Sequence, residues 1–157
     1  MAIIIESPNE IYSAKNINNV KLFLAGGITE CEDWQSYVCE ELKDIEELTI
    51  YNPRRKSSVF NVEEQISWEY SHLNNADIIF FWFSKETLNP ITLYELGMWA
   101  NSRNDIAILL GVDPEYKRKI DVNIQTQLAK PGTIIYDNIP DMLEKLQDIF
   151  KHITEEN

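Results

Sequence analysis

The chain has 157 residues, 44% of them hydrophobic, so we expect one domain with a substantial buried core. Its formal net charge of -12 argues against nucleic acid or an anionic membrane as the main partner, because either would repel the chain. No apolar run is long enough to cross a membrane and no secretory leader is evident, so a cytoplasmic protein is expected.

Strand and helix patterns alternate along residues 20–157, which we take as the domain, after a lead-in over residues 1–19. The lead-in contains one short candidate strand at Ala2–Ile5. Short apolar runs predict five strands in the domain, at Val20–Ala25, Leu48–Tyr51, Asp77–Phe83, Ile106–Leu110 and Thr133–Tyr136.

Helices are predicted between these strands. Thr29 and Glu32 form a capping-box pattern that predicts the start of the first helix. The second helix is expected over residues 62–75, with one apolar stripe made of Val62, Ile66, Tyr70 and Leu73. Asn89 followed by Pro90 predicts the start of the third helix, with Asn89 as its cap.

The region Asp113–Lys130 is predicted as a loop with an irregular helix. A final helix begins after Asp137 or Asn138, with Pro140 in its first turn. Its expected core-facing residues are Leu143, Leu146, Ile149, Phe150 and Ile153.

Alternating strands and helices predict a parallel sheet with right-handed crossovers. We therefore expect a single-domain, three-layer α/β sandwich, Rossmann-like or flavodoxin-like, with five mainly parallel strands. Ligands of such sheets bind beyond the carboxyl ends of the strands. The segments that reach this edge are Gly26-Gly27, Asn52–Arg55, Ser84–Asn89 and the residues after Leu110.

Glu95 is the first candidate for chemistry, in the segment Asn89–Gly97 that follows the most apolar strand. We place Glu95 near the end of the first helical turn, where the positive end of the helix favours an ionised, nucleophilic carboxylate. Gly97, without a side chain, permits close approach of a ligand or another backbone. An ordinary acidic residue beside a packing glycine is the alternative interpretation.

Glu69 is the second candidate carboxylate. Gln65 and His72 lie four residues before it and three after it, so the three share a helix face that is able to look towards the crevice. A solvated helix flank is the alternative. Asp77, which opens the next strand, is interpreted as structural.

Two adjacent arginines, Arg54 and Arg55, follow the second strand and are able to hold a phosphate or pair with site carboxylates; surface charge is the alternative. The cluster Lys117–Lys119 is interpreted as solvated surface. Gly26-Gly27 is a weak nucleotide signal without a third glycine.

With two histidines and two cysteines, the chain is expected to hold no metal and no cofactor, and its chemistry is expected to depend on carboxylates. The spacing of Cys31 and Cys39 fits neither a zinc site nor a disulfide framework, so both are expected as reduced thiols.

Considered together, five segments resemble nucleoside 2-deoxyribosyltransferases over roughly Val20–Asn123. These segments are Leu22–Gly27, Asn52–Arg55, Gln65–Glu69, Ala76-Asp77 and Asn89–Gly97. The resemblance implies a Rossmann-like fold, a homo-oligomer, and transfer of 2-deoxyribose between nucleobases. A nucleoside or nucleotide and a free base are the implied partners, in nucleotide salvage.

The resemblance also implies roles for individual residues. Glu95 matches the family's nucleophile, and Glu69 takes the place of an aspartate that handles the proton of the base. Asn123 matches, loosely, an asparagine that enters the neighbouring subunit's site. Substrate-binding positions implied at the edge of the sheet include Gly26 and Gly27.

Two positions depart from the family pattern. Phe23 replaces a tyrosine that helps to position the nucleophile, and Asn89 replaces an aspartate that helps to hold the sugar. Pro90, Ile91 and Thr92 replace glycines. The sugar end of the site is therefore expected to differ from that of the family.

Three functions remain open at this point. A carboxylate beneath C1′ stabilises and then traps an oxocarbenium-like sugar, while a second carboxylic acid protonates the departing base. Transfer results if another base then reaches the glycosyl-enzyme. A second possibility is an N-glycosidase of deoxynucleoside 5′-monophosphates, with Arg54 and Arg55 on the phosphate. A third is a non-catalytic nucleotide-binding module, because fold alone does not decide function.

Overall fold

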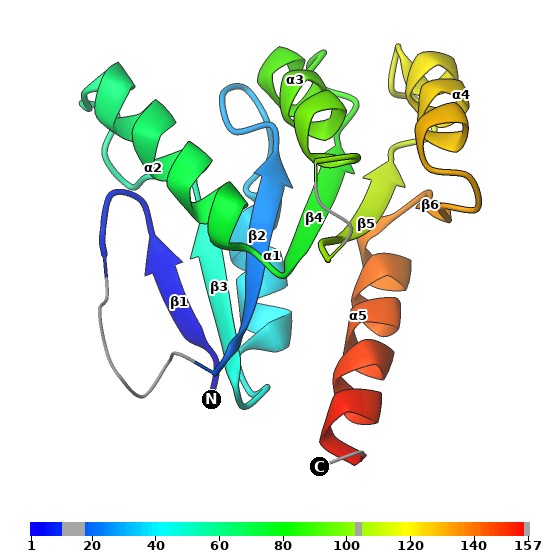
Figure 1. Ribbon diagram of the computed structural model, residues 1–157. Coiled ribbons are helices and arrows are strands. Elements are labelled where there is room, and N and C mark those ends of the chain that lie inside the picture. Colours follow the sequence, from blue (N-terminus) through cyan, green and yellow to red (C-terminus); the bar gives the residue numbers. More distant parts are fainter. Residues whose placement is uncertain (11–17, 103–104, 156–157) are drawn as a thin grey trace.

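The computed structural model describes residues 1–10, 18–102 and 105–155, and side chains as far as His152. The chain forms a parallel sheet between two layers of helices (Figure 1). The predicted three-layer α/β sandwich is therefore confirmed.

Six strands form the sheet within the described residues, in the order β1-β3-β2-β4-β5-β6, and every pairing is parallel. They are β1 (Ile3–Glu6), β2 (Val20–Gly26), β3 (Leu48–Asn52), β4 (Ile78–Phe83), β5 (Ala107–Val112) and β6 (Ile135–Tyr136). Strands β2 to β6 have the predicted flavodoxin-like order. The short strand expected in the lead-in adds β1 beside β3, with Ile3 opposite Thr49, so the sheet has six strands instead of five.

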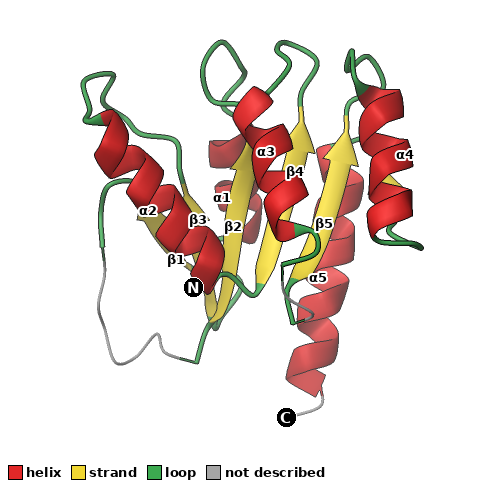
Figure 2. Cartoon of the chain, turned by 45° about the horizontal axis from the view of Figure 1, so that its top comes forward, coloured by secondary structure: helices red, strands yellow, loops and turns green. Residues whose placement is uncertain are grey.

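Two helices cover one face of the sheet and three cover the other (Figure 2). The helices α1 (Trp34–Leu42) and α5 (Ile139–Glu155) lie on one face, and α2 (Val62–Asn75), α3 (Pro90–Trp99) and α4 (Lys119–Ala129) lie on the other. None of the helices in the described ranges is long and apolar enough to cross a membrane.

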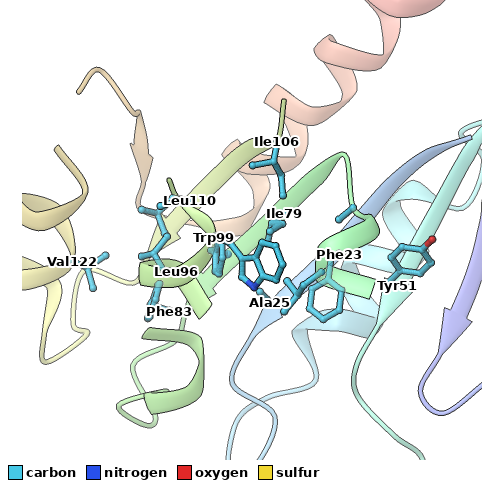
Figure 3. Packing of buried hydrophobic residues seen from close by; sticks show 14 of the residues in the cluster. Phe23, Ala25, Tyr51, Ile79, Phe83, Leu96, Trp99, Ile106, Leu110 and Val122 are labelled. Atoms are coloured by element: carbon cyan, nitrogen blue, oxygen red, sulfur yellow. The ribbon is translucent and has the colours of Figure 1, made fainter. Parts of the chain in front are cut away.

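Each face of the sheet carries its own hydrophobic core. All six residues of β4 are buried, as expected for a central parallel strand with both faces covered. On the α2–α4 face, Leu96 and Trp99 of α3 belong to one cluster with Ala25 and Ile79 of the strands (Figure 3). The core thus fixes α3, the helix that carries Glu95, against the central strands.

The predicted start of the first helix was wrong. The cap of α1 is Asp33, whose carboxylate accepts a hydrogen bond from the Ser36 backbone N–H at 3.0 Å, four residues beyond Thr29. The segment before it stays a loop because Arg54 donates to the backbone carbonyls of Cys31 and Glu32. Those carbonyls are therefore directed towards the guanidinium group.

The apolar stripe of α2 does not face the core. Val62, Ile66 and Tyr70 are exposed, and only Leu73 of the stripe is buried. An amphipathic helix usually buries its apolar stripe. Here a polar and aromatic face is buried instead, made of Gln65, Trp68 and His72 together with Leu73.

Two differences concern the C-terminal part of the chain. Helix α4 is a regular helix of 11 residues, not an irregular one; it buries Val122 and Thr126, while its apolar residues Ile120, Ile124 and Leu128 are exposed. Because the apolar stripe of α4 is exposed, the sequence pattern did not identify the residues through which this helix contacts the core. In α5, the buried residues are Leu143, Leu146 and Phe150 as predicted, together with Ile139 and Met142. Ile149 is half-buried, and the side chain of Ile153 lies outside the described residues.

Candidate functional site

The candidate site lies at the edge of the sheet where the parallel strands have their carboxyl ends, the usual ligand edge of this fold (Figure 2). The segments that reach it include Ser7 after β1, Gly26-Gly27 at β2, Asn52–Arg55 at β3, Ser84–Asn89 after β4 and, as predicted, the residues that follow β5. Asp77 lies at the opposite end of β4, where its carboxylate accepts from the Lys21 N–H at 2.8 Å. Asp77 is thus structural, as predicted.

Glu95 lies in the second turn of α3, not in the first. The helix begins at Pro90, which makes Glu95 its sixth residue, and the effect of the helix dipole has largely faded at that distance. The side chain is buried, with 8% of its surface exposed. Burial first, and the negative charge of Glu69 second, raise the pKa of Glu95 to about 8. The prediction of an ionised resting carboxylate at this position was therefore wrong.

Glu69 is close enough to Glu95 for its charge to affect the pKa of that group, so the structure brings the two predicted carboxylates together. Partial burial raises the pKa of Glu69, while a hydrogen bond from Gln65 and the positive charge of Arg55 oppose the rise. Gln65 Nε2 donates to Glu69 Oε1 at 2.6 Å. The two acids therefore have unequal surroundings, which is how a site assigns different roles to a pair of carboxylates.

Gln65 connects Glu69 to two other segments. Its Oε1 accepts hydrogen bonds from Ser7 Oγ at 2.7 Å and from Arg55 Nε, and its Nε2 also donates to the Pro53 carbonyl at 3.0 Å. Sequence inspection placed Gln65 on the Glu69 face but missed Ser7. Only the pairing of β1 with β3 brings Ser7 to this edge, and no local pattern indicates that pairing.

The two arginines have different surroundings. Arg54 contacts the β2–α1 loop and the start of α1: it donates to Gln35 Oε1 at 2.9 Å and to the Glu32 carbonyl at 2.8 Å, and pairs with Asp33 at 3.2 Å. Arg55 instead lies near Glu69, where its positive charge opposes the rise of the pKa caused by burial, and donates to Gln65. Arg54 is therefore occupied by structural contacts.

Arg55 is nine-tenths buried. It packs over the Phe60 ring at 5.1 Å, and its Nη2 lies 3.8 Å from Glu64 Oε2. That distance allows an ion pair but is too long for a hydrogen bond, and Nη2 has no hydrogen-bond partner among the described residues.

The predicted substrate-binding glycines are closely packed. A side chain on Gly26 would meet the Trp34 ring at 2.5 Å and the Trp82 carbonyl at 2.6 Å. One on Gly27 would meet Asn89 Oδ1 at 2.0 Å. Close packing of the β2–α1 loop therefore requires a glycine at both positions.

Asn89 is the N-cap residue of α3 and Pro90 begins the helix, as predicted, but Asn89 does not cap through its side chain. It adopts the left-handed conformation with φ 48°, which asparagine tolerates, and its side chain makes no capping bond. Its Nδ2 donates to the carbonyls of Ser84 and Thr87, both at 3.1 Å, and its Oδ1 accepts from Thr87 Oγ1 at 3.0 Å. The amide thus fixes the β4–α3 loop beside the site.

The remaining predicted residues lie in different places. Phe23 is fully buried in β2 and packs on Trp68 of α2, with ring centroids 6.2 Å apart. Asn123 lies on α4, and its Oδ1 is buried without a hydrogen-bond partner among the described residues. His72 shares the face of Glu69 as predicted, but its Nδ1 contacts the Trp68 carbonyl at 2.7 Å.

The basic cluster Lys117–Lys119 and the two cysteines were not predicted as site residues. Arg118 and Lys119 pair with Asp121 and Asp137 at the surface, as solvated charges do. Both cysteines are free thiols. Among the residues that the structure describes, no three or more His, Cys, Asp or Glu side chains are grouped so as to hold a metal ion.

A comparison with protein-family models matches residues 19–113 to the family described as nucleoside 2-deoxyribosyltransferase like. The matched region extends from just before β2 to the end of β5 and includes both carboxylates. The comparison with curated proteins finds no match to the chain.

Proposed function

The chain belongs to the nucleoside 2-deoxyribosyltransferase-like family, and we propose on that basis that it transfers 2-deoxyribose between nucleobases through a covalent intermediate on Glu95. The observation that carries this proposal is the pairing of Glu95 and Glu69, which come from two different helices and have unequal surroundings. A pair of this kind supplies both a nucleophile and an acid.

The chemistry requires one proton on the pair. As the bond between C1′ and the base nitrogen breaks, its electron pair moves to the nitrogen, which takes a proton from the acid carboxyl. A Glu95 oxygen then forms the bond to C1′. Transfer is completed when the nitrogen of a second base attacks C1′, releases the Glu95 carboxylate and returns a proton.

The loops beside α3 offer a place for the substrate. A pocket of about 290 Å³ lies between the β2–α1 loop and the first turn of α3. Hydroxyl groups in its lining are able to bind the hydroxyls of a sugar. The lining residues that we propose for substrate binding are Gly26, Gly27, Thr29, Thr87, Asn89 and Thr92.

Hydrolysis of deoxynucleoside monophosphates is the second candidate. The observation in its favour is the Arg55 Nη2, a buried cationic nitrogen without a hydrogen-bond partner among the described residues. A phosphate oxygen is a strong acceptor for such a group. Because Arg54 is occupied by the β2–α1 loop, any role of this pair in phosphate binding would depend on Arg55.

We also propose that the protein is a homo-oligomer in which Asn123 completes the site of a neighbouring subunit. Asn123 lies on α4, a helix whose exposed apolar residues support a partner chain. Exposed apolar side chains on the same face of the molecule support burial against another chain. Those on α3 and α4 include Ile91, Tyr94, Ile120, Ile124 and Leu128.

Product analysis tests the proposed reaction. The protein is incubated with a panel of deoxynucleosides and deoxynucleoside monophosphates, each with and without a free base, and the products are separated by chromatography. Transfer predicts a new nucleoside only when the acceptor base is present. Free sugar phosphate formed regardless of acceptor would support hydrolysis instead, and no reaction with any substrate would contradict both candidates.

A further inference from the structure

The amide of Gln65 has no free hydrogen-bonding capacity. A glutamine side chain offers two donors and two acceptor positions. Here the oxygen accepts from Ser7 and Arg55, and the nitrogen donates to Pro53 and Glu69. Gln65 itself is buried, with 9% of its surface exposed.

The same partners permit only one orientation of this amide. Arginine is a donor and never an acceptor, so the side of Gln65 that faces Arg55 Nε must be its oxygen. The Pro53 carbonyl is an acceptor, so the side that faces it must be the NH₂ group. Rotating the amide by half a turn would oppose donor to donor and acceptor to acceptor. Gln65 is therefore held as a donor towards Glu69.

The two carboxyl groups differ in what stabilises their ionised forms. Glu69 Oε1 accepts the short Gln65 hydrogen bond and has the Arg55 guanidinium nearby. Glu95 is more deeply buried and accepts no hydrogen bond from any described residue. A donor and a cation favour a carboxylate, whereas burial without partners favours the neutral acid.

We propose that Gln65, held by Ser7 and Arg55, is a positioning residue that keeps Glu69 ionised in the substrate-free protein and leaves the one proton of the pair on Glu95. The charged groups that interact with Glu69 are Arg55 and the carboxyl of Glu95, and Arg55 in turn pairs with Glu64. This inference rests on the proposed function only in assigning the two carboxyl groups to the reaction.

The proposed arrangement sets the order of proton transfers. The reaction needs the opposite arrangement, a carboxylate at Glu95 and a carboxylic acid at Glu69, so the proton of the pair moves from Glu95 to Glu69 before the bond breaks. The base nitrogen then takes that proton as the C1′–N bond breaks, and Glu95 bonds to C1′. The departing base takes the proton of the pair, and the base that attacks later returns one. No other acid is therefore needed for departure of the base.

Carboxyl titration without substrate tests the inference. The protein is labelled with ¹³C at the glutamate carboxyl carbon and followed by NMR over pH, and the two signals are assigned from Glu69→Gln and Glu95→Gln. We expect Glu69 to ionise at lower pH than Glu95. In Gln65→Met, we expect the titration of Glu69 to move up by about one pH unit or more, because the donor to its ionised form is lost.

Gln35→Met is the matched control. Gln35 is also buried and also bonds an arginine, but its partners are Arg54 and the Gly27 carbonyl. We expect its loss to leave the Glu69 titration unchanged. If Gln65→Met does not fold, Ser7→Ala, which removes one of the two donors to Gln65, should give a smaller shift in the same direction.

The inference is overturned if Glu69 ionises at or above the pH of Glu95 in the wild type, or if a folded Gln65→Met leaves the Glu69 titration unchanged. Activity separates this failure from failure of the proposed function. If both carboxyl groups titrate as expected but the protein turns over no nucleoside, the proposed function is refuted and the inference about Gln65 stands. If the protein does turn over a nucleoside, we expect Gln65→Met to shift the pH profile of kcat/KM. A merely structural loss would lower kcat/KM by the same factor at all pH values.

Discussion

The pKa of Glu95 links the burial of this residue to the stability of the fold. Its value of about 8, against 4.5 for an ordinary glutamate, means that the folded protein binds this proton more tightly than the unfolded chain does. The free energy of unfolding should therefore fall as pH rises from about 4.5 to about 8. In the unfolded chain the same carboxyl is already ionised over that range.

Glu95→Gln should remove this loss of stability, because a neutral amide carries no charge at any of these pH values. At pH 8 we expect the variant to exceed the wild type by roughly 2 kcal/mol or more in free energy of unfolding, since each pKa unit corresponds to about 1.36 kcal/mol. Urea unfolding at pH 5 and pH 8 measures the difference. Equal pH dependence in both proteins would contradict the raised pKa.

The two arginines should behave differently when each is replaced by alanine. Arg54→Ala removes hydrogen bonds to Gln35 and Glu32, so we expect it to lower stability by roughly 1–3 kcal/mol without changing the preference between nucleoside and monophosphate. If a phosphate is bound, Arg55→Ala should raise KM for the monophosphate alone. Thermal unfolding and kcat/KM for both substrates distinguish the variants. A selective rise in KM caused by Arg54→Ala would contradict these roles.

At the scale of secondary-structure elements, the strands were the most predictable part. Continuous apolar runs such as β4 are read directly from the sequence, and their alternation with helices predicts the parallel sheet. The position of β1 was not predictable, because Ile3–Glu6 pairs with a strand more than forty residues away. The helix start at Asp33 was missed because a capping-box pattern four residues earlier satisfies the same local rule.

The start of α1 gives a paired test. Asp33→Ala removes the cap bond to Ser36 and the ion pair with Arg54, so we expect a loss of about 1–2 kcal/mol in stability. Thr29→Ala should leave the stability nearly unchanged, since Thr29 is exposed and caps no helix. Thermal unfolding compares the two variants. A larger loss of stability for Thr29→Ala than for Asp33→Ala would support Thr29, not Asp33, as the cap of α1.

The candidate site was predictable where it depends on local sequence patterns, and not where it depends on contacts between distant segments. Glu95 and Glu69 are recognised because each lies on a helix next to the carboxyl edge, and the spacing of four residues places Gln65 beside Glu69. Burial, which raises the pKa of Glu95, depends on contacts between distant segments and leaves no local pattern. The hydrogen bond from Ser7 to Gln65 and the different surroundings of Arg54 and Arg55 also depend on contacts between distant segments.

At the scale of the whole molecule, the α2–α4 face exposes apolar residues that a stable monomer would rarely leave in water. We expect the protein to self-associate, and Ile124→Glu combined with Leu128→Glu to weaken association by placing charges in the interface. Light scattering measures the mass. Tyr37→Glu, on α1 of the opposite face, is the control. A fully active wild-type monomer would contradict a site completed by Asn123 of a neighbouring subunit.

Trapping the intermediate tests the nucleophile most directly. The wild type is incubated with a deoxynucleoside and no acceptor base, quenched in acid, digested and analysed by mass spectrometry. We predict a deoxyribosyl adduct on the peptide that contains Glu95, formed by the wild type and absent from Glu95→Gln, together with loss of base exchange in the variant. Normal base exchange by Glu95→Gln, or an adduct on another residue, would contradict Glu95 as the nucleophile.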